Sequence, residues 1–109
     1  VAVTDASGVL AAFLRMPGAF LHSVDIAIDK AYTSAGFGFA TAQWAGILQG
    51  DEALRLGMPT RPRNVVFGGG LPMREGGALV AGIGVSGGSA EQDEICARAA
   101  LQALGLDAA

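Results

Sequence analysis

The stretch GGALVAGIGVSGGSAEQDEICARAALQALG, residues 76–105, predicts a buried strand that turns directly into a helix. Its first part, residues 78–85, is an apolar run that only Gly82 and Gly84 interrupt. Such a run is typical of a central strand that is covered on both faces. Glycines inside a strand indicate that another part of the backbone packs closely against it. We therefore expect this strand to lie at the centre of the sheet.

The helix that follows carries clear start and stop signals. Ser89 is a favourable N-cap, and Gln92 stands three residues later as its partner in a capping box. Acidic side chains occupy the first turn, where the helix dipole favours negative charge. Gly105 is placed to end the helix. These signals predict a helix that begins directly after Ser89 and stops at Gly105.

Glycines in this stretch raise the question of a bound ligand. Gly82, Gly84 and Gly87 have the G-x-G-x-x-G spacing of dinucleotide-binding proteins. That site needs a further strand after the helix, and no strand pattern follows here, so we exclude it. The amides of Gly87 and Gly88 are candidates for holding one carboxylate or phosphate at the helix start. A hinge that binds nothing is the simpler alternative.

Composition limits the size of the domain and the kind of partner. The 109 residues are enough for one domain, residues 1–109. Seven basic residues and a net charge of −3 provide no basic patch for nucleic acid. Hydrophobic residues make up 51% of the chain, yet no apolar run is long enough to span a membrane. We therefore expect the excess apolar surface to be buried in a homo-oligomer, a dimer or a larger assembly.

The single cysteine and the first residues bear on the compartment. Cys96 excludes an internal disulfide and is expected to be a small core residue. The chain opens in a strand pattern, Val1-Ala2-Val3, with no signal peptide. We expect a cytoplasmic protein. Export stays open as an alternative, because the natural chain could start upstream of Val1.

The remaining segments complete an α+β pattern. Two strand-like runs flank the turn Asp5-Ala6-Ser7-Gly8, which predicts a hairpin. A helix is expected to start at Ser23 as N-cap and to end at Gly36 and Gly38, with Lys30 on its polar face. Short helices at 42–48 and 50–55, an exposed loop at 58–63 and strands at 64–67 and 71–75 give the order ββα(α)βββα. This order predicts a five-stranded antiparallel sheet flanked by helices, with more sheet surface than two long helices cover.

Motifs in both halves of the chain point to a known family. The first half contains Val3-Thr4-Asp5-Ala6-Ser7-Gly8, Arg15-Met16-Pro17-Gly18-Ala19, Ser23-Val24-Asp25-Ile26-Ala27 and Lys30-Ala31-Tyr32-Thr33; the second contains Gly69-Gly70-Leu71-Pro72, Gly82-Ile83-Gly84-Val85-Ser86-Gly87-Gly88 and Asp93. Together they resemble the GlcG/HbpS family, which includes the C-terminal domain of PduO. The resemblance implies a profilin-like fold, self-association and, in characterised members, haem binding. It also implies a helix before the first strand, which this chain lacks, so a partner chain is a candidate to supply it.

His22 is the only histidine and the first candidate for an axial ligand of haem iron. Imidazole is a common haem ligand, and Phe20 with its apolar neighbours is suited to line a porphyrin pocket. A surface histidine before a helix is the alternative. Thioether and thiol side chains are chemically able second ligands, although each is more often a core or loop residue: Met16, Met58, Met73 and Cys96. His22, Asp25 and Asp29 also have the spacing of a weak metal site, with a solvated helix face as the alternative.

Charged residues supply the candidate chemistry. Lys30, if partly buried, is a candidate to pair with a haem propionate or to act as a base, and an exposed lysine is the alternative. With Asp5 and Arg15 it forms a candidate catalytic set for a lyase or isomerase that acts on an organic acid in an intersubunit pocket. The leading hypothesis is a haem-binding sensor, carrier or store. Such an enzyme is the second hypothesis, and a purely structural partner subunit is the third.

Overall fold

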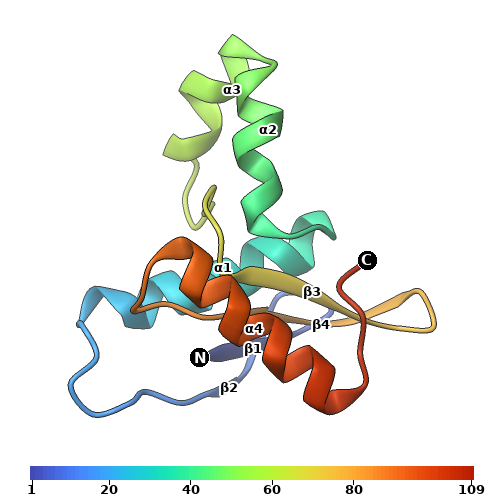
Figure 1. The fold of residues 1–109 in the computed structure, drawn as a ribbon. Helices are drawn as coiled ribbons and strands as arrows, with labels where there is room; N and C mark the ends of the chain where they lie inside the picture. Colours follow the sequence, from blue (N-terminus) through green and yellow to red (C-terminus); the bar gives the residue numbers. More distant parts are fainter.

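The computed structural model describes residues 1–109 as one antiparallel sheet with a helix on each face (Figure 1). The four strands lie in the order β2-β1-β4-β3. Helix α1 packs against β1, β4 and β3, and α4 packs against β3 and β4 on the other face. The elements are β1 (Ala2–Asp5), β2 (Leu10–Phe13), α1 (His22–Phe37), η1 (Thr41–Gln43), α2 (Trp44–Gln49), α3 (Glu52–Gly57), η2 (Met58–Thr60), β3 (Gly70–Glu75), β4 (Ala78–Gly84) and α4 (Ala90–Leu104).

The predicted α+β class and the β1–β2 hairpin are confirmed, whereas the prediction of five strands is wrong. Residues 64–67, expected as a strand, form an irregular segment. The amide of Val65 donates to the Thr33 hydroxyl on α1 at 3.1 Å, so a side chain takes the place of a neighbouring strand. The same hydroxyl donates to the carbonyl of Arg63, whose φ of 63° bends the chain. Residues 58–60, expected as loop, form the short 3₁₀ turn η2.

Strand β4 is central, as predicted, and α1 lies directly on its backbone. A Cβ at Gly84 would collide with the carbonyl oxygen of Ala27, and one at Gly82 would collide with that of Ala31. The small side chains of α1 and the two glycines therefore bring helix and strand together without any gap for a larger residue. The first half of β4 is more open than predicted, because full burial begins only at Gly82.

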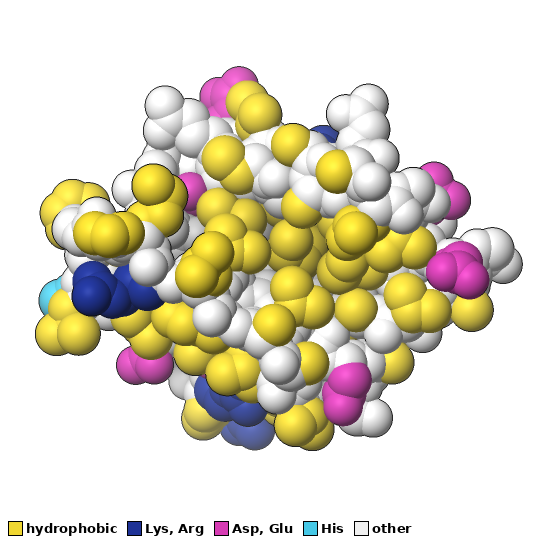
Figure 2. All heavy atoms as spheres, turned by 90° about the horizontal axis from the view of Figure 1, so that it is seen from below, with side chains coloured by type: hydrophobic (Ala, Val, Ile, Leu, Met, Phe, Trp, Pro, Cys, Tyr) yellow, Lys and Arg dark blue, Asp and Glu magenta, His cyan; other side chains and the backbone are white.

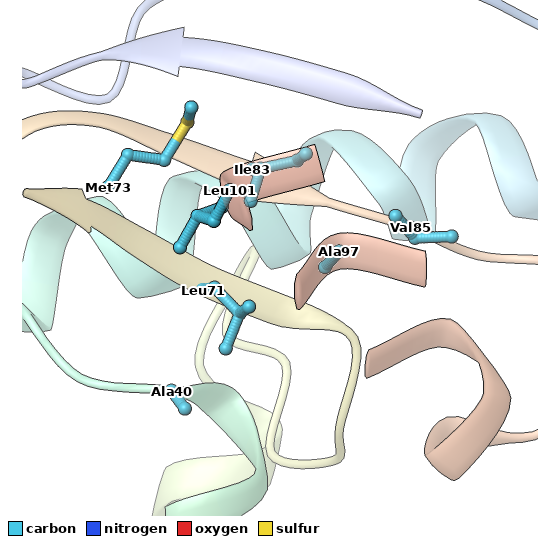
Figure 3. Close-up of a cluster of buried hydrophobic side chains, with 7 residues drawn as sticks. All are labelled: Ala40, Leu71, Met73, Ile83, Val85, Ala97 and Leu101. Carbon is cyan, nitrogen blue, oxygen red and sulfur yellow. The ribbon is translucent and has the colours of Figure 1, made fainter. Parts of the chain in front are cut away.

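The hydrophobic core has one part on each face of the sheet. The larger part lies under α4, where Ala97 and Leu101 meet side chains of β3 and β4 (Figure 3). Its buried members are Ala40, Leu71, Met73, Ile83, Val85, Ala97 and Leu101. The smaller part, between β1 and α1, contains Ala2, Ala27 and Ala31. Because α4 covers β3 and β4, the edge strand β2 remains mostly exposed.

The two long helices differ in how well their ends could be predicted. At α4, Ser89 and Gln92 form the predicted capping box, and Gly105 is the left-handed C-cap. At α1, Gly38 is the C-cap as predicted, whereas Gly36, also expected to end the helix, lies inside it. The helix begins at His22 and has no side-chain cap. The prediction of Ser23 as N-cap is therefore wrong, and its side chain is buried instead.

Helices α2 and α3 form an arm that projects from the body (Figure 1). None of the helices combines the length and the apolar character needed to cross a membrane.

Candidate functional site

A cavity of ligand size lies between the loop after β2 and the start of α4. Its volume is about 550 Å³, which is within the range of small-molecule and cofactor sites. One wall comes from the β2–α1 connection and the first turn of α1, and the other from the β4–α4 turn and α4. The lining residues are Val1, Phe13, Leu14, Arg15, Met16, Pro17, Gly18, Ala19, Phe20, Ser23, Val24, Val85, Ser86, Gly87, Gly88, Asp93 and Cys96. We call this cavity the main pocket.

Beneath one wall of the main pocket is a buried ion pair. The Nζ atom of Lys30 lies 3.0 Å from Oδ2 of Asp93 and donates to the carbonyl oxygen of Val85 at 2.9 Å. Lys30 is 1% exposed and Asp93 is 4% exposed. The ammonium also lies 5.1 Å from the centre of the Phe67 ring, which adds a cation–π contact. The prediction of Lys30 on an exposed polar face is therefore wrong, because its stem crosses the core to reach this carboxylate.

The second oxygen of Asp93 closes the turn before α4. Its Oδ1 atom accepts from the amide of Gly88 at 2.9 Å. One of the two glycine amides expected to hold an external anion is therefore already occupied by a carboxylate of the chain itself. Gly87, with a φ of +130°, is exposed on the pocket wall.

Some of the predicted haem-site residues line the main pocket, and His22 does not. Phe20, Gly87 and Gly88 line it, as does Arg15. His22 is exposed on the first turn of α1, between the lining residues Phe20 and Ser23, and is not itself part of the lining. No group of three side chains suited to a metal ion is present, and Asp29 is instead paired with Arg63 at 3.0 Å.

The three candidate catalytic residues are not brought together. Arg15 lines the main pocket, and Lys30 reaches it only through Asp93. Asp5 ends β1 and lies outside the pocket lining. Its carboxylate accepts from the amides of Ser7 and Val9 and so shapes the hairpin turn.

Sulfur side chains also take different places. Met16 and Cys96 line the main pocket, whereas Met73 is in the core and Met58 begins η2. The prediction of Cys96 as a core residue is wrong, because Asp93, Ala97 and Leu101 form the buried face of α4 and Cys96 lies outside it. The buried residues of α4 recur at four-residue spacing, and Cys96 falls outside that row.

The pocket has a mixed electrostatic character. Arg15 is its one basic side chain and Asp93, paired with Lys30, its one acidic side chain. Partial burial lowers the pKa of the Val1 amino group below its ordinary value, while the charge of Asp93 acts in the opposite direction. The remaining lining is largely apolar, which suits an apolar ligand that carries a negatively charged group near Arg15.

Fold and pocket together define a small α+β domain with a ligand-sized cavity beside a glycine-rich strand-to-helix turn. Residues 1–102 match the family described as haem-degrading protein HbpS-like. The chain belongs to this HbpS-like family, which confirms the resemblance stated from its sequence motifs.

Individual relatives agree with this assignment. An uncharacterised 15.0 kDa protein from the dhaT–dhaS intergenic region of Citrobacter freundii is 38% identical over 100 residues, which cover 91% of this chain and 70% of that protein. The corrinoid adenosyltransferase PduO of Salmonella typhimurium is 36% identical over 107 residues, which cover 97% of this chain but 32% of the enzyme. The crystal structure of a PduOC–haem complex superposes with a TM-score of 0.89 at 33% identity, over 98% of this chain and 78% of the other.

Proposed function

We propose that this protein binds haem in the main pocket and acts as a haem sensor, carrier or store. The observation that carries the proposal is an apolar cavity of about 550 Å³ with a single guanidinium, Arg15, in its lining. A porphyrin ring needs an extended apolar surface, and its propionates need a positive or hydrogen-bonding edge. The haem complex of PduOC, a relative with the same fold, supports the choice of ligand.

The residues present fit such a ligand. Phe13, Phe20 and Val85 offer apolar surface to the macrocycle, and Arg15 offers charge-assisted hydrogen bonds to a propionate. When bound, haem would supply an iron centre whose properties depend on its axial ligand. The ammonium of Lys30 is already bonded to Asp93, so Arg15 is the better partner for a propionate.

We keep His22 as the first-choice axial ligand. Its side chain is exposed, so it is not fixed in the core and can turn toward a bound iron. Its neighbours Phe20 and Ser23 both line the pocket. Cys96 and Met16 are competing ligands because both line the pocket directly. Imidazole, thiolate and thioether ligands give different iron spectra, so the three can be told apart.

Titration with hemin, followed by the Soret band, tests both parts of this proposal. The parent is expected to show a saturable shift, and His22→Ala to give a different spectrum at saturation. Cys96→Ser and Met16→Leu are the matched controls and are expected to keep the parent spectrum. No saturable shift in the parent would refute haem binding. A parent-like spectrum in His22→Ala, with a changed one in Cys96→Ser, would move the ligand assignment to the thiol.

A second candidate function is an enzyme or enzyme subunit that acts on an organic acid. The observation that favours it is Arg15, a carboxylate-binding group inside a cavity of ligand size. The competition between the two candidates is direct, because both use the same cavity. A small carboxylate that raises the melting temperature of the parent but not of Arg15→Met, without any hemin binding, would favour the enzyme.

We further propose that the protein self-associates in the cytoplasm. Hydrophobic side chains form a broad area across the underside of the fold (Figure 2). Exposed large apolar residues near β2 and on α4 include Leu10, Leu14 and Ile95. Areas of this kind are usually interaction sites in soluble proteins. A second copy, or a helix supplied by a partner chain, would cover the part of the sheet that α4 leaves open.

A further inference from the structure

The buried pair Lys30–Asp93 connects α1, α4 and the β4–α4 turn behind one wall of the main pocket. Lys30 comes from α1, Asp93 from α4, and their further partners Val85 and Gly88 from the two ends of the β4–α4 turn. The ammonium packs closely against the backbone at Gly69. A Cβ atom added to that glycine would lie only 2.6 Å from Nζ, so no space is left there. The pair therefore lies in a dry site where its hydrogen bonds are strong and hard to replace.

These bonds fix the turn on both sides of Ser86 and Gly87. At Val85 the amide donates to the carbonyl oxygen of Gly69 at 2.9 Å, and the carbonyl accepts from Lys30. At Gly88 the amide donates to Asp93. Both ends of a two-residue segment are thus held by one ion pair, which limits how far the segment can move.

The two residues between these ends have free donors. The amides of Ser86 and Gly87 donate to no acceptor within the chain, and both residues line the main pocket. Backbone amides in proteins are nearly always paired with protein, water or ligand. Amides that lack a partner within the chain are open to solvent or to an oxyanion of a ligand. A carboxylate accepts several such bonds at once.

We propose that Lys30 and Asp93 are positioning residues that present the Ser86 and Gly87 amides to a carboxylate of the bound ligand. This inference rests on the proposed function in taking haem, with its two propionates, as that ligand. Arg15 supplies the positive charge on the pocket lining, and the amides supply donors whose direction the ion pair fixes.

The competing explanation is that the ion pair has a purely structural role. The two roles differ in which ligands they affect. Buried ion pairs can often be replaced by apolar residues without loss of stability, so stability alone does not explain why charge is placed here. A structural pair would affect every ligand of the pocket alike. A positioning pair affects only ligands that carry the carboxylate.

The first experiment needs no ligand. Amide hydrogen exchange at Ser86, Gly87 and Gly88 is compared between the parent and Lys30→Met. Faster exchange at Gly88, and changed chemical shifts for all three amides, are expected in the variant. Asp29→Asn, which removes an exposed ion pair on the same helix, is the matched control and should leave these amides unchanged. Unaltered shifts and exchange in Lys30→Met would overturn the positioning role.

The second experiment compares hemin with its dimethyl ester, which has the same ring and iron but no carboxylate. Lys30→Met is expected to weaken hemin binding roughly tenfold to a hundredfold, the range seen when groups that position a ligand shell are lost. Its affinity for the ester is expected to match that of the parent. Equal losses for both compounds would overturn the inference in favour of a structural pair.

A second variant keeps the test decisive if Lys30→Met does not fold. In Lys30→Met with Asp93→Leu, no charge is left unpaired, so folding is expected to survive. This variant should reproduce the selective loss of hemin over its ester. If the parent itself fails to bind hemin, the proposed function and the carboxylate role both fall. The exchange experiment then decides separately whether the pair positions the turn.

Discussion

Replacement of Gly84 by alanine tests the packing that places α1 against the sheet. The new methyl group would collide with the carbonyl oxygen of Ala27 and lie 2.6 Å from the amide nitrogen of Ala31. Atoms of this kind normally stay about 3.5–4.0 Å apart, so α1 would have to move by roughly 1 Å. Overpacking of this kind costs about 3 kcal/mol, a large share of the roughly 5–15 kcal/mol that holds such a domain together.

The same substitution elsewhere in the chain provides the control. A Cβ at Gly46, inside α2, meets nothing within 4 Å. Gly46→Ala is therefore expected to stabilise the protein by about 0.5–1 kcal/mol, because alanine is the better helix former. Urea unfolding of both variants gives the comparison, and melting temperatures should differ from the parent by about −12 °C and about +3 °C. If Gly84→Ala were as stable as the parent, the close contact between α1 and β4 would be refuted.

Three further perturbations test the cap, the ion pair and the assembly. Ser89→Ala should destabilise the protein by about 1 kcal/mol in thermal melts, because the amide of Gln92 loses its acceptor; no change would mean that the cap contributes little. Lys30→Met should cost about 3–5 kcal/mol in urea unfolding, since it leaves Asp93 buried without its cation, and a loss below 1 kcal/mol would show that water reaches the carboxylate. Light scattering at low micromolar concentration should give a mass above the 10.9 kDa of one chain. Covering about 400 Å² of apolar surface on each partner is worth about 20 kcal/mol before association costs, and a folded species of single-chain mass would contradict self-association.

Local signals in the sequence predicted the elements that local chemistry controls. The capping box at Ser89 and the left-handed glycine at Gly105 were confirmed, because each involves residues a few positions apart. Gly82 and Gly84 predicted a close backbone approach, although the sequence could not say that α1 would supply it. The family motifs covered nearly the whole chain, so the fold followed from them.

Long-range contacts explain what the sequence did not predict. Residues 64–67 have the composition of a strand, but the amide of Val65 donates to Thr33 on α1 and not to a neighbouring strand. Lys30 is a residue type expected on an exposed helix face, and its burial depends on Asp93, which lies 63 positions away. Cys96 was assigned to the core on residue type alone, whereas the rotation of α4 places it on the pocket wall. For Val65 and Lys30 the deciding partner lies far along the chain.

Haem binding in the main pocket can be tested through the single thiol on the pocket wall. Cys96 is exposed and lines the pocket, so a maleimide reagent should modify it readily in the free protein. Measuring the rate of this modification with increasing hemin is the most direct measurement. We predict that the rate falls as hemin is added and reaches its minimum at the same hemin-to-protein ratio as the Soret shift. A saturable Soret shift with an unchanged rate of modification would place the haem elsewhere on the protein and refute its binding in the main pocket.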